Sequence, residues 1–117
     1  MRQQKRKEPV VDRYMFPFMR ETIAQLQNLG KIRTSETYRS ALSSFMRFRE
    51  GRDIRISDIT DDVLISYEDA LKVSGLSSNT TSFYMRILRA VYNRAVRLGV
   101  AKQEYPFKYV YTGVDKT

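Results

Sequence analysis

The sequence predicts an all-α domain, and three observations lead to this prediction. Several stretches place apolar residues three and four positions apart, which is the spacing of one helix face. A glycine follows each stretch, where a helix commonly ends in a left-handed residue: Gly30, Gly51, Gly75 and Gly99. Only three prolines and five glycines occur in 117 residues, which argues against a turn-rich β fold. We therefore expect one helical domain.

The first helix is predicted near residues 13–29, with Pro17 tolerated in its first turn. Its apolar face is expected to contain Phe18 or Met19, Ile23 (or Thr22), Leu26 and Leu29. Thr34 or Ser35 is expected to cap the second helix, which Gly51 ends. The apolar face of the second helix is expected to contain Tyr38, Leu42, Phe45 and Phe48 (or Arg49).

The third helix is predicted to begin after residues 53–59, whose brief alternation indicates a short extended connection. Thr60 is expected to cap it, with Asp61 and Asp62 near the positive helix end. Its expected core residues are Leu64, Tyr67 and either Ala70 or Leu71. Together with Asp58, the two aspartates could instead form a metal-binding cluster. A helix start explains them without further assumption, so we predict no metal site.

The fourth helix is predicted to run from a cap at Ser77 or Ser78 to Gly99, over about 30 Å. One stripe along it is apolar and consists of Tyr84, Leu88, Val91, Ala95 and Leu98. The opposite stripe is polar and basic and consists of Ser82, Arg86, Arg89, Asn93 and Arg97. No acid occurs in residues 77–102, although opposite charges would stabilise an exposed helix. This pattern indicates an anionic partner.

The charge of the whole chain agrees with such a partner, since the formal net charge is +8. Two basic segments, residues 31–52 and 77–102, flank the acidic segment 53–76. A folded domain that presents two basic elements on one face would produce this alternation. We expect that face to bind nucleic acid.

Several function classes are disfavoured by composition. The absence of cysteine removes disulfides and thiolate metal sites, and the absence of histidine removes the commonest general base. No apolar run is long enough to span a membrane. The basic N-terminus lacks an apolar signal core, so we expect a cytoplasmic protein. We predict no catalytic residue, no cofactor and no small-molecule ligand.

The candidate DNA contacts lie on the second and fourth helices. Backbone N–H groups at a helix N-terminus bind phosphate, and hydroxyl, amide and guanidinium groups contact phosphates or base edges. The predicted contact residues are Thr37, Arg39, Ser43, Arg47, Ser78, Asn79, Thr80, Arg86, Arg89 and Arg97. The aromatic residues at helical spacing, including Phe83 and Tyr84, are assigned to packing. No role is assigned to Tyr105, Tyr109 or Tyr111.

Both ends of the chain are predicted to lie outside the helical domain. Residues 1–12 are polar and basic and are interpreted as a flexible arm or an upstream linker. Pro106 prevents the fourth helix from continuing. The aromatic alternation of Phe107, Tyr109 and Tyr111 then predicts a short strand or an extended exit.

Four pieces of the sequence resemble tyrosine recombinases of the phage-integrase class, in the same order: TSETYRSALSSFMRF, ISDITDDVLISYEDAL, GLSSNTTSFYMRILRAVYNRAVRLG and YPFKY. The resemblance covers about Phe18–Tyr109 and is strongest to the SAM-like core-binding domain of integrases from Bacteroides-type mobile elements. The most specific pattern is L-S-x-N-T-x(5)-R-x-L-R-x-x-Y-N-x-A, which here comprises Leu76, Ser77, Asn79, Thr80, Arg86, Leu88, Arg89, Tyr92, Asn93 and Ala95.

The resemblance implies a bundle of four or five helices, here residues 13–104, followed by a short extended linker, residues 105–117. In the family, the second and fourth helices face the major groove and form one arm of a C-shaped clamp on duplex DNA. A separate catalytic domain supplies the nucleophilic tyrosine, and other protomers join in a synaptic complex. The resemblance therefore implies a chain that binds the recombination core site without cutting it, in the bacterial nucleoid.

Two alternatives remain open from the sequence. The stretch LKVSGLSSNTTSFYMRI, with Gly75 at the turn, also resembles a helix-turn-helix regulator. Alternatively, the chain is a helical protein-interaction module whose basic face binds an acidic partner. Binding to a palindrome as a two-fold dimer would favour the regulator, and absence of duplex binding would favour the interaction module.

Overall fold

The computed structural model describes residues 12–113, which form four α-helices and one short 3₁₀ helix and contain no strand. The elements are α1 (Met15–Asn28), α2 (Ile32–Phe48), η1 (Ile56–Asp58), α3 (Asp61–Val73) and α4 (Ser78–Arg97). The prediction of an all-α bundle is confirmed. The basic arm predicted for residues 1–12 lies outside the described residues, except for its last residue.

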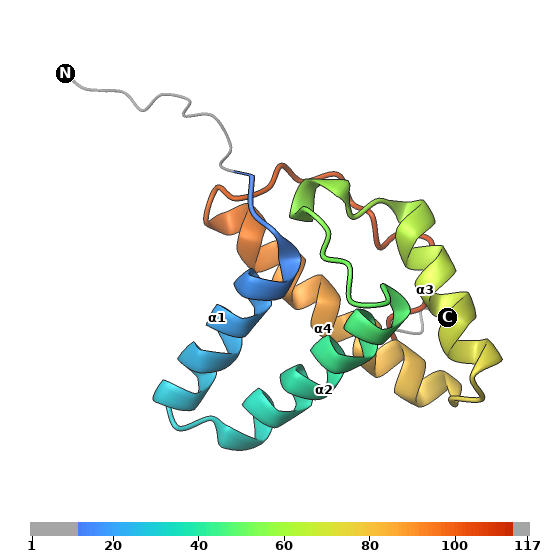
Figure 1. Ribbon diagram of the computed structural model, residues 1–117, viewed down its shortest axis with the longest axis horizontal. Helices are drawn as coiled ribbons and strands as arrows, with labels where there is room; N and C mark the ends of the chain where they lie inside the picture. The colour runs from blue at the N-terminus through green and yellow to red at the C-terminus, as the bar shows by residue number, and fades with distance from the viewer. Residues whose placement is uncertain (1–11, 114–117) are drawn as a thin grey trace.

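The helices are arranged around α4, the longest of them (Figure 1). α1 and α2 form a V that is joined at its lower end, and α4 passes behind α2. α3 lies on the side away from α1 and packs against both α2 and α4. The chain after α4 returns along the upper edge of the molecule toward α3.

The core lies where the apolar faces of these helices meet. α1 contributes Phe18, Met19 and Ile23, as expected, whereas Leu29 is 70% exposed beyond the helix end. α4 contributes Leu88, Val91 and Ala95, whereas Leu98 is 57% exposed. Both exceptions occupy the last position of a predicted stripe, where the helix has already ended and the next element turns away.

An aromatic cluster joins α2 to α3. The ring of Phe45 meets that of Tyr67 at a centroid distance of 5.2 Å and an interplanar angle of 82°. Phe48 lies against the same tyrosine ring, also at 5.2 Å. The Tyr67 hydroxyl shares a buried 2.7 Å hydrogen bond with the Ser44 hydroxyl, so its polar atom is satisfied inside the core. Leu71, rather than Ala70, completes the core face of α3.

The predicted N-terminal caps are right for two helices and wrong for one. The Thr60 and Ser77 side chains accept hydrogen bonds from the backbone N–H groups of Val63 and Thr80. α2 instead begins at Ile32 without a side-chain cap. Thr34 and Ser35 lie inside its first turn, and the buried Ser35 hydroxyl donates to the carbonyl of Ile32.

The early start of α2 follows from the turn that ends α1. Gly30 has a φ of +80°, and Lys31 donates its N–H back to the carbonyl of Leu26 over 2.9 Å. The chain is therefore already reversed at Lys31, and the next helix can begin at once. At the end of α2 two successive residues are left-handed: Gly51, as predicted, with a φ of 78°, and Glu50 before it, with a φ of 55°.

The connection before α3 is extended in its first part only. Arg55 pairs with Tyr14 in an isolated antiparallel bridge, which agrees with the prediction. Residues 56–58 instead form η1, which buries Ile56 completely. A single pairing residue cannot extend into a strand, and the 3₁₀ turn brings the chain back to α3.

The segment after α4 is folded onto the bundle. Between residues 105 and 113 it forms turns and no strand, and Phe107, Val110 and Thr112 are buried. Phe107 packs against Tyr92 of α4 with ring centroids 5.9 Å apart. The boundary between domain and linker at residues 104 and 105 stays a prediction.

Candidate nucleic-acid interface

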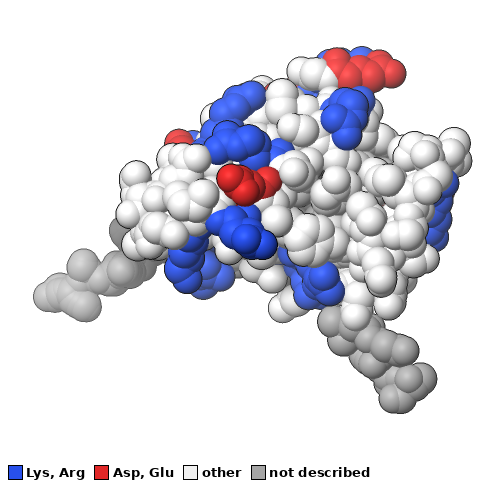
Figure 2. Space-filling view, turned by 90° about the horizontal axis from the view of Figure 1, so that it is seen from below, with Lys and Arg blue, Asp and Glu red and all other residues white. Residues whose placement is uncertain are grey.

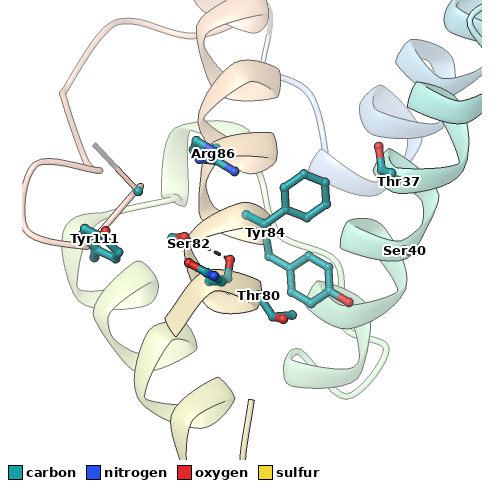
Figure 3. A pocket seen from close by; sticks show the side chains of 10 residues that line it. Thr37, Ser40, Thr80, Ser82, Tyr84, Arg86 and Tyr111 are labelled. Atoms are coloured by element: carbon teal, nitrogen blue, oxygen red, sulfur yellow. Dashed lines mark hydrogen bonds between the residues drawn. The ribbon is translucent and has the colours of Figure 1, made fainter. Parts of the chain in front are cut away.

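A shallow groove of about 530 Å³ lies over the first half of α4 and reaches α2 on one side. Figure 3 shows Thr37 and Ser40 of α2 on one side of it and Tyr111 on the other. Four of the predicted contact residues line this groove together: Thr37, Asn79, Thr80 and Arg86. The structure therefore joins residues of the two predicted helices in one concave surface.

The N-terminal end of α4 lies at the groove. Ser77 caps the helix by accepting the N–H of Thr80 at 3.2 Å, and its own hydroxyl donates to the Thr80 hydroxyl. Ser78 and Asn79, in the first turn, have exposed side chains. A helix N-terminus carries partial positive charge and exposed N–H groups, which favour an anion.

Arg86 is exposed and lies within the groove, where its guanidinium carbon is 5.6 Å from the centre of the Phe83 ring. Phe83 is 37% exposed, so its assignment to the core is wrong. Ser82 was expected on the basic face, but it is buried and donates to the carbonyl of Asn79. Tyr84 extends from α4 toward α2 in Figure 3 and is half-buried.

Arg89 follows one turn later and is half-buried. Its Nη1 donates to the hydroxyl of Thr112, at 3.1 Å. It also borders a second depression of about 320 Å³, together with Asn93, Gln103 and Lys108. The side chain of Arg89 thus links α4 to the C-terminal segment.

The other predicted residues of α2 and α4 border different depressions. Arg39 and Ser43 face toward α1, where Arg20 lies with them, and Arg47 borders a further depression near Gly51. Arg97 lies between α1, α2 and α4, beside Tyr38. Burial raises the pKa of Tyr38 above its ordinary value of 10, so this phenol stays neutral beside Arg97 even at mildly alkaline pH. The ten predicted residues therefore do not all line the same groove, and their role as DNA contacts stays a prediction.

Within residues 12–113, the predicted contact arginines are not neutralised by ion pairs. The ion pairs within residues 12–113 join Arg13 to Glu21, Arg52 to Glu50, Arg55 to Asp12 and Lys72 to Glu68. None of them contains one of the five predicted contact arginines. Figure 2 shows a face of the molecule on which blue basic side chains clearly outnumber red acidic ones. Such a surface attracts a polyanion.

One arginine of α4 has a structural position that the sequence did not distinguish. Arg94 donates to the Thr22 hydroxyl at 3.0 Å and to the Gln25 side-chain oxygen at 2.7 Å, both on α1. Its guanidinium also lies 5.2 Å from the centre of the Phe18 ring. Arg94 therefore fastens α4 to α1.

The groove also contains residues that the sequence analysis did not single out as contacts: Ser40, Ser82, Phe83, Tyr84, Tyr111 and Gly113. The polar start of α4 was the only signal that pointed toward them. Tyr111 and Gly113 arrive from the C-terminal segment, and no periodicity relates them to α4.

Comparison with known proteins identifies one family. The family model described as the phage integrase SAM-like domain matches residues 14–110, which include all four helices and the C-terminal segment as far as Val110. No curated protein and no solved structure gives a significant match. Among residues 12–113, no helix has both the length and the apolar character needed to cross a bilayer.

Proposed function

The chain belongs to the phage integrase SAM-like family, as an N-terminal SAM-like domain of a tyrosine recombinase, and from this premise we propose that it binds duplex DNA at a recombination core site. The contact surface would be the groove between α2 and the first half of α4. Arg89 and Arg97 of α4 and Arg39, Ser43 and Arg47 of α2 would reach flanking phosphates.

The observation that carries the proposal is the convergence of two helices on one groove. Thr37 of α2 and Asn79, Thr80 and Arg86 of α4 line it together, at the positive end of a 20-residue helix. Phosphate would approach the exposed start of α4 and the guanidinium of Arg86, while Asn79 carries an amide suited to base edges. This combination favours nucleic acid over an acidic protein.

The chain is the SAM-like region of such recombinases, which is distinct from their catalytic domain. We propose that it supplies affinity and position while strand cleavage belongs to a catalytic domain of the parent recombinase. Residues 105–117 would then lead toward that domain, and other recombinase protomers would be its partners in synapsis. The place of action would be the bacterial cytoplasm, at the nucleoid.

A salt titration tests the proposal. If about five phosphates are contacted, the logarithm of the binding constant falls with the logarithm of salt concentration with a slope near −4 to −5. Fluorescence anisotropy of a labelled mixed-sequence duplex measures this slope. A binding constant that does not change with salt would remove the phosphate contacts from the proposal.

A pair of arginine variants locates the surface. Arg86→Ala is expected to weaken binding and to reduce the magnitude of the slope by about one, because one phosphate contact is lost. Arg55→Gln removes the same charge from a residue paired with Asp12, away from α2 and α4, and should leave the slope unchanged. Circular dichroism checks that both variants remain helical. Equal effects of the two variants would contradict the assignment of the groove.

A further inference from the structure

The C-terminal segment leaves the end of α4, crosses the upper edge of the molecule toward α3 (Figure 1), and reaches the candidate groove at Tyr111 and Gly113. The side chains of Phe107 and Val110 are buried in the core. Residues 111–113, which follow them, contact α3 and α4. Tyr111 and Gly113 form part of the groove lining. A segment expected to be a linker therefore contributes to the binding surface.

A buried carboxylate fixes the position of this segment. Glu68 of α3 is only 8% exposed, and its Oε2 accepts the backbone N–H of Tyr111 at 3.0 Å. Its Oε1 lies 3.9 Å from the ammonium group of Lys72. Burying a carboxylate is costly unless hydrogen bonds and charges compensate it, so its partners are expected to be held firmly. Glu68 thus joins α3 to the C-terminal segment through this hydrogen bond.

The next two residues of the segment meet the two central arginines of α4. The Thr112 hydroxyl accepts from Nη1 of Arg89 at 3.1 Å. Gly113 lies against Arg86, and a Cβ atom at this position would be 2.6 Å from Nη1 of Arg86 and 3.3 Å from the Ser82 hydroxyl. Its φ of +86° also disfavours any other residue. Figure 3 shows Arg86 and Tyr111 on the same side of α4.

We propose that residues 110–113 form a third wall of the DNA-binding groove, and that Glu68 is the positioning residue that holds this wall and thereby orients Arg86 and Arg89. This inference rests on the proposed function. Arginine has five donors, so the single bond to Thr112 leaves the others of Arg89 available to phosphate. The segment presents the arginines to DNA and does not block them.

We expect the segment to raise DNA affinity because it already restricts the side chains of Arg86 and Arg89 in the free protein. Immobilising one long side chain on binding lowers the affinity by about two- to tenfold. Two arginines that are already held by the segment would not lose this affinity. Releasing the segment should therefore weaken DNA binding by about 5- to 30-fold. The same phosphates would still be neutralised, so the salt slope should not change.

Three variants of the full chain test the role of Glu68. Glu68→Leu removes the acceptor for Tyr111, Glu68→Gln retains a carbonyl acceptor, and Asp69→Asn removes one charge from the exposed neighbour on the same helix. Hydrogen exchange of the Tyr111 amide and affinity for a labelled mixed-sequence duplex are both measured. We expect fast exchange and weak binding for Glu68→Leu alone, with Glu68→Gln close to the wild-type chain.

Two further variants remain informative if Glu68→Leu does not fold. Thr112→Val removes the acceptor of Arg89 with little change in shape, and Gly113→Ala displaces the guanidinium of Arg86. Each should lower affinity about two- to tenfold with an unchanged salt slope. Loss of the arginine itself, in Arg86→Ala, reduces the slope, which separates positioning from contact.

These measurements test DNA binding by the domain and the role of residues 110–113 separately. If the wild-type chain does not bind duplex DNA at low salt, the proposed function fails and the role of the segment fails with it. If the wild-type chain binds and Glu68→Leu, Thr112→Val and Gly113→Ala bind as Asp69→Asn does, only the third wall is overturned. Tighter binding by these variants would also overturn it, because the segment would then compete with DNA.

Discussion

At the scale of single residues, Arg94 and Arg97 show how neighbouring arginines of α4 acquire different roles. Arg94 is half-buried and bonded to two side chains of α1, whereas Arg97 is exposed and forms no ion pair with any residue between 12 and 113. Helical spacing placed Arg97 on the basic stripe and gave Arg94 no role. The structural role of Arg94 could not be predicted, because it depends on where α1 lies.

Arg94→Ala should lower the free energy of unfolding by about 1–2 kcal/mol, because two hydrogen bonds and the contact with Phe18 are lost. Arg97→Ala should change it by less than about 0.5 kcal/mol, as exposed substitutions usually do, while weakening DNA binding. Urea unfolding followed by circular dichroism measures both. A stability loss shared equally by the two variants would contradict these roles.

Tyr67 makes stability depend on alkaline pH. Burial raises the pKa of Tyr67 to about 12, and the hydrogen bond from Ser44 opposes this shift. The unfolded chain loses the phenolic proton near pH 10, its ordinary value, whereas the folded chain keeps it. The contribution of this group is therefore complete below pH 10 and is lost as the pH rises from 10 toward 12.

We expect the unfolding free energy to fall by up to about 2 kcal/mol across that window because of Tyr67. Urea unfolding at several pH values measures the decline. We expect Tyr67→Phe to be less stable at neutral pH, because it leaves the Ser44 hydroxyl without its partner, and to show a shallower alkaline decline. Equal slopes for the two chains would assign the pH dependence to other groups.

At the scale of elements, helix ends could be predicted wherever a side chain or a glycine fixes them. Thr60 and Ser77 begin α3 and α4, and Gly75 and Gly99 follow their ends in the left-handed conformation. The start of α2 could not be predicted, because a backbone turn at Lys31 sets it and no side chain caps it. Glu50 likewise takes a left-handed position that the sequence reserves for glycine.

The cap of α4 gives a test at this scale. Ser77→Ala should lower the unfolding free energy by about 1 kcal/mol, because the N–H of Thr80 loses its acceptor. Ser78→Ala, one residue later, should keep the stability and weaken DNA binding instead. Thermal unfolding and duplex titration of both variants measure these effects. A stability loss confined to Ser78→Ala would mean that the cap is misassigned.

At the scale of the whole molecule, the family and the helical bundle could be predicted, but the composition of the groove could not. Successive residues of a helix are about 100° apart, so Thr37 and Arg39 face nearly opposite directions and cannot line one surface. Which of them lies beside α4 depends on how α2 crosses it. Thr37 reaches the groove, while Arg39 turns toward α1. The same dependence places Phe83 at the surface.

Segments near both ends of the described chain pack against α4, so the shape of this helix depends on the whole domain. Arg94 ties α4 to α1, some 70 residues earlier, and Phe107 packs onto it from the other end. An isolated 20-residue peptide with unbalanced positive charge gains little helix from propensity alone. α4 is therefore not a portable recognition peptide. Its shape belongs to a cooperative unit, and trimming either end of that unit would loosen the helix that carries most of the groove.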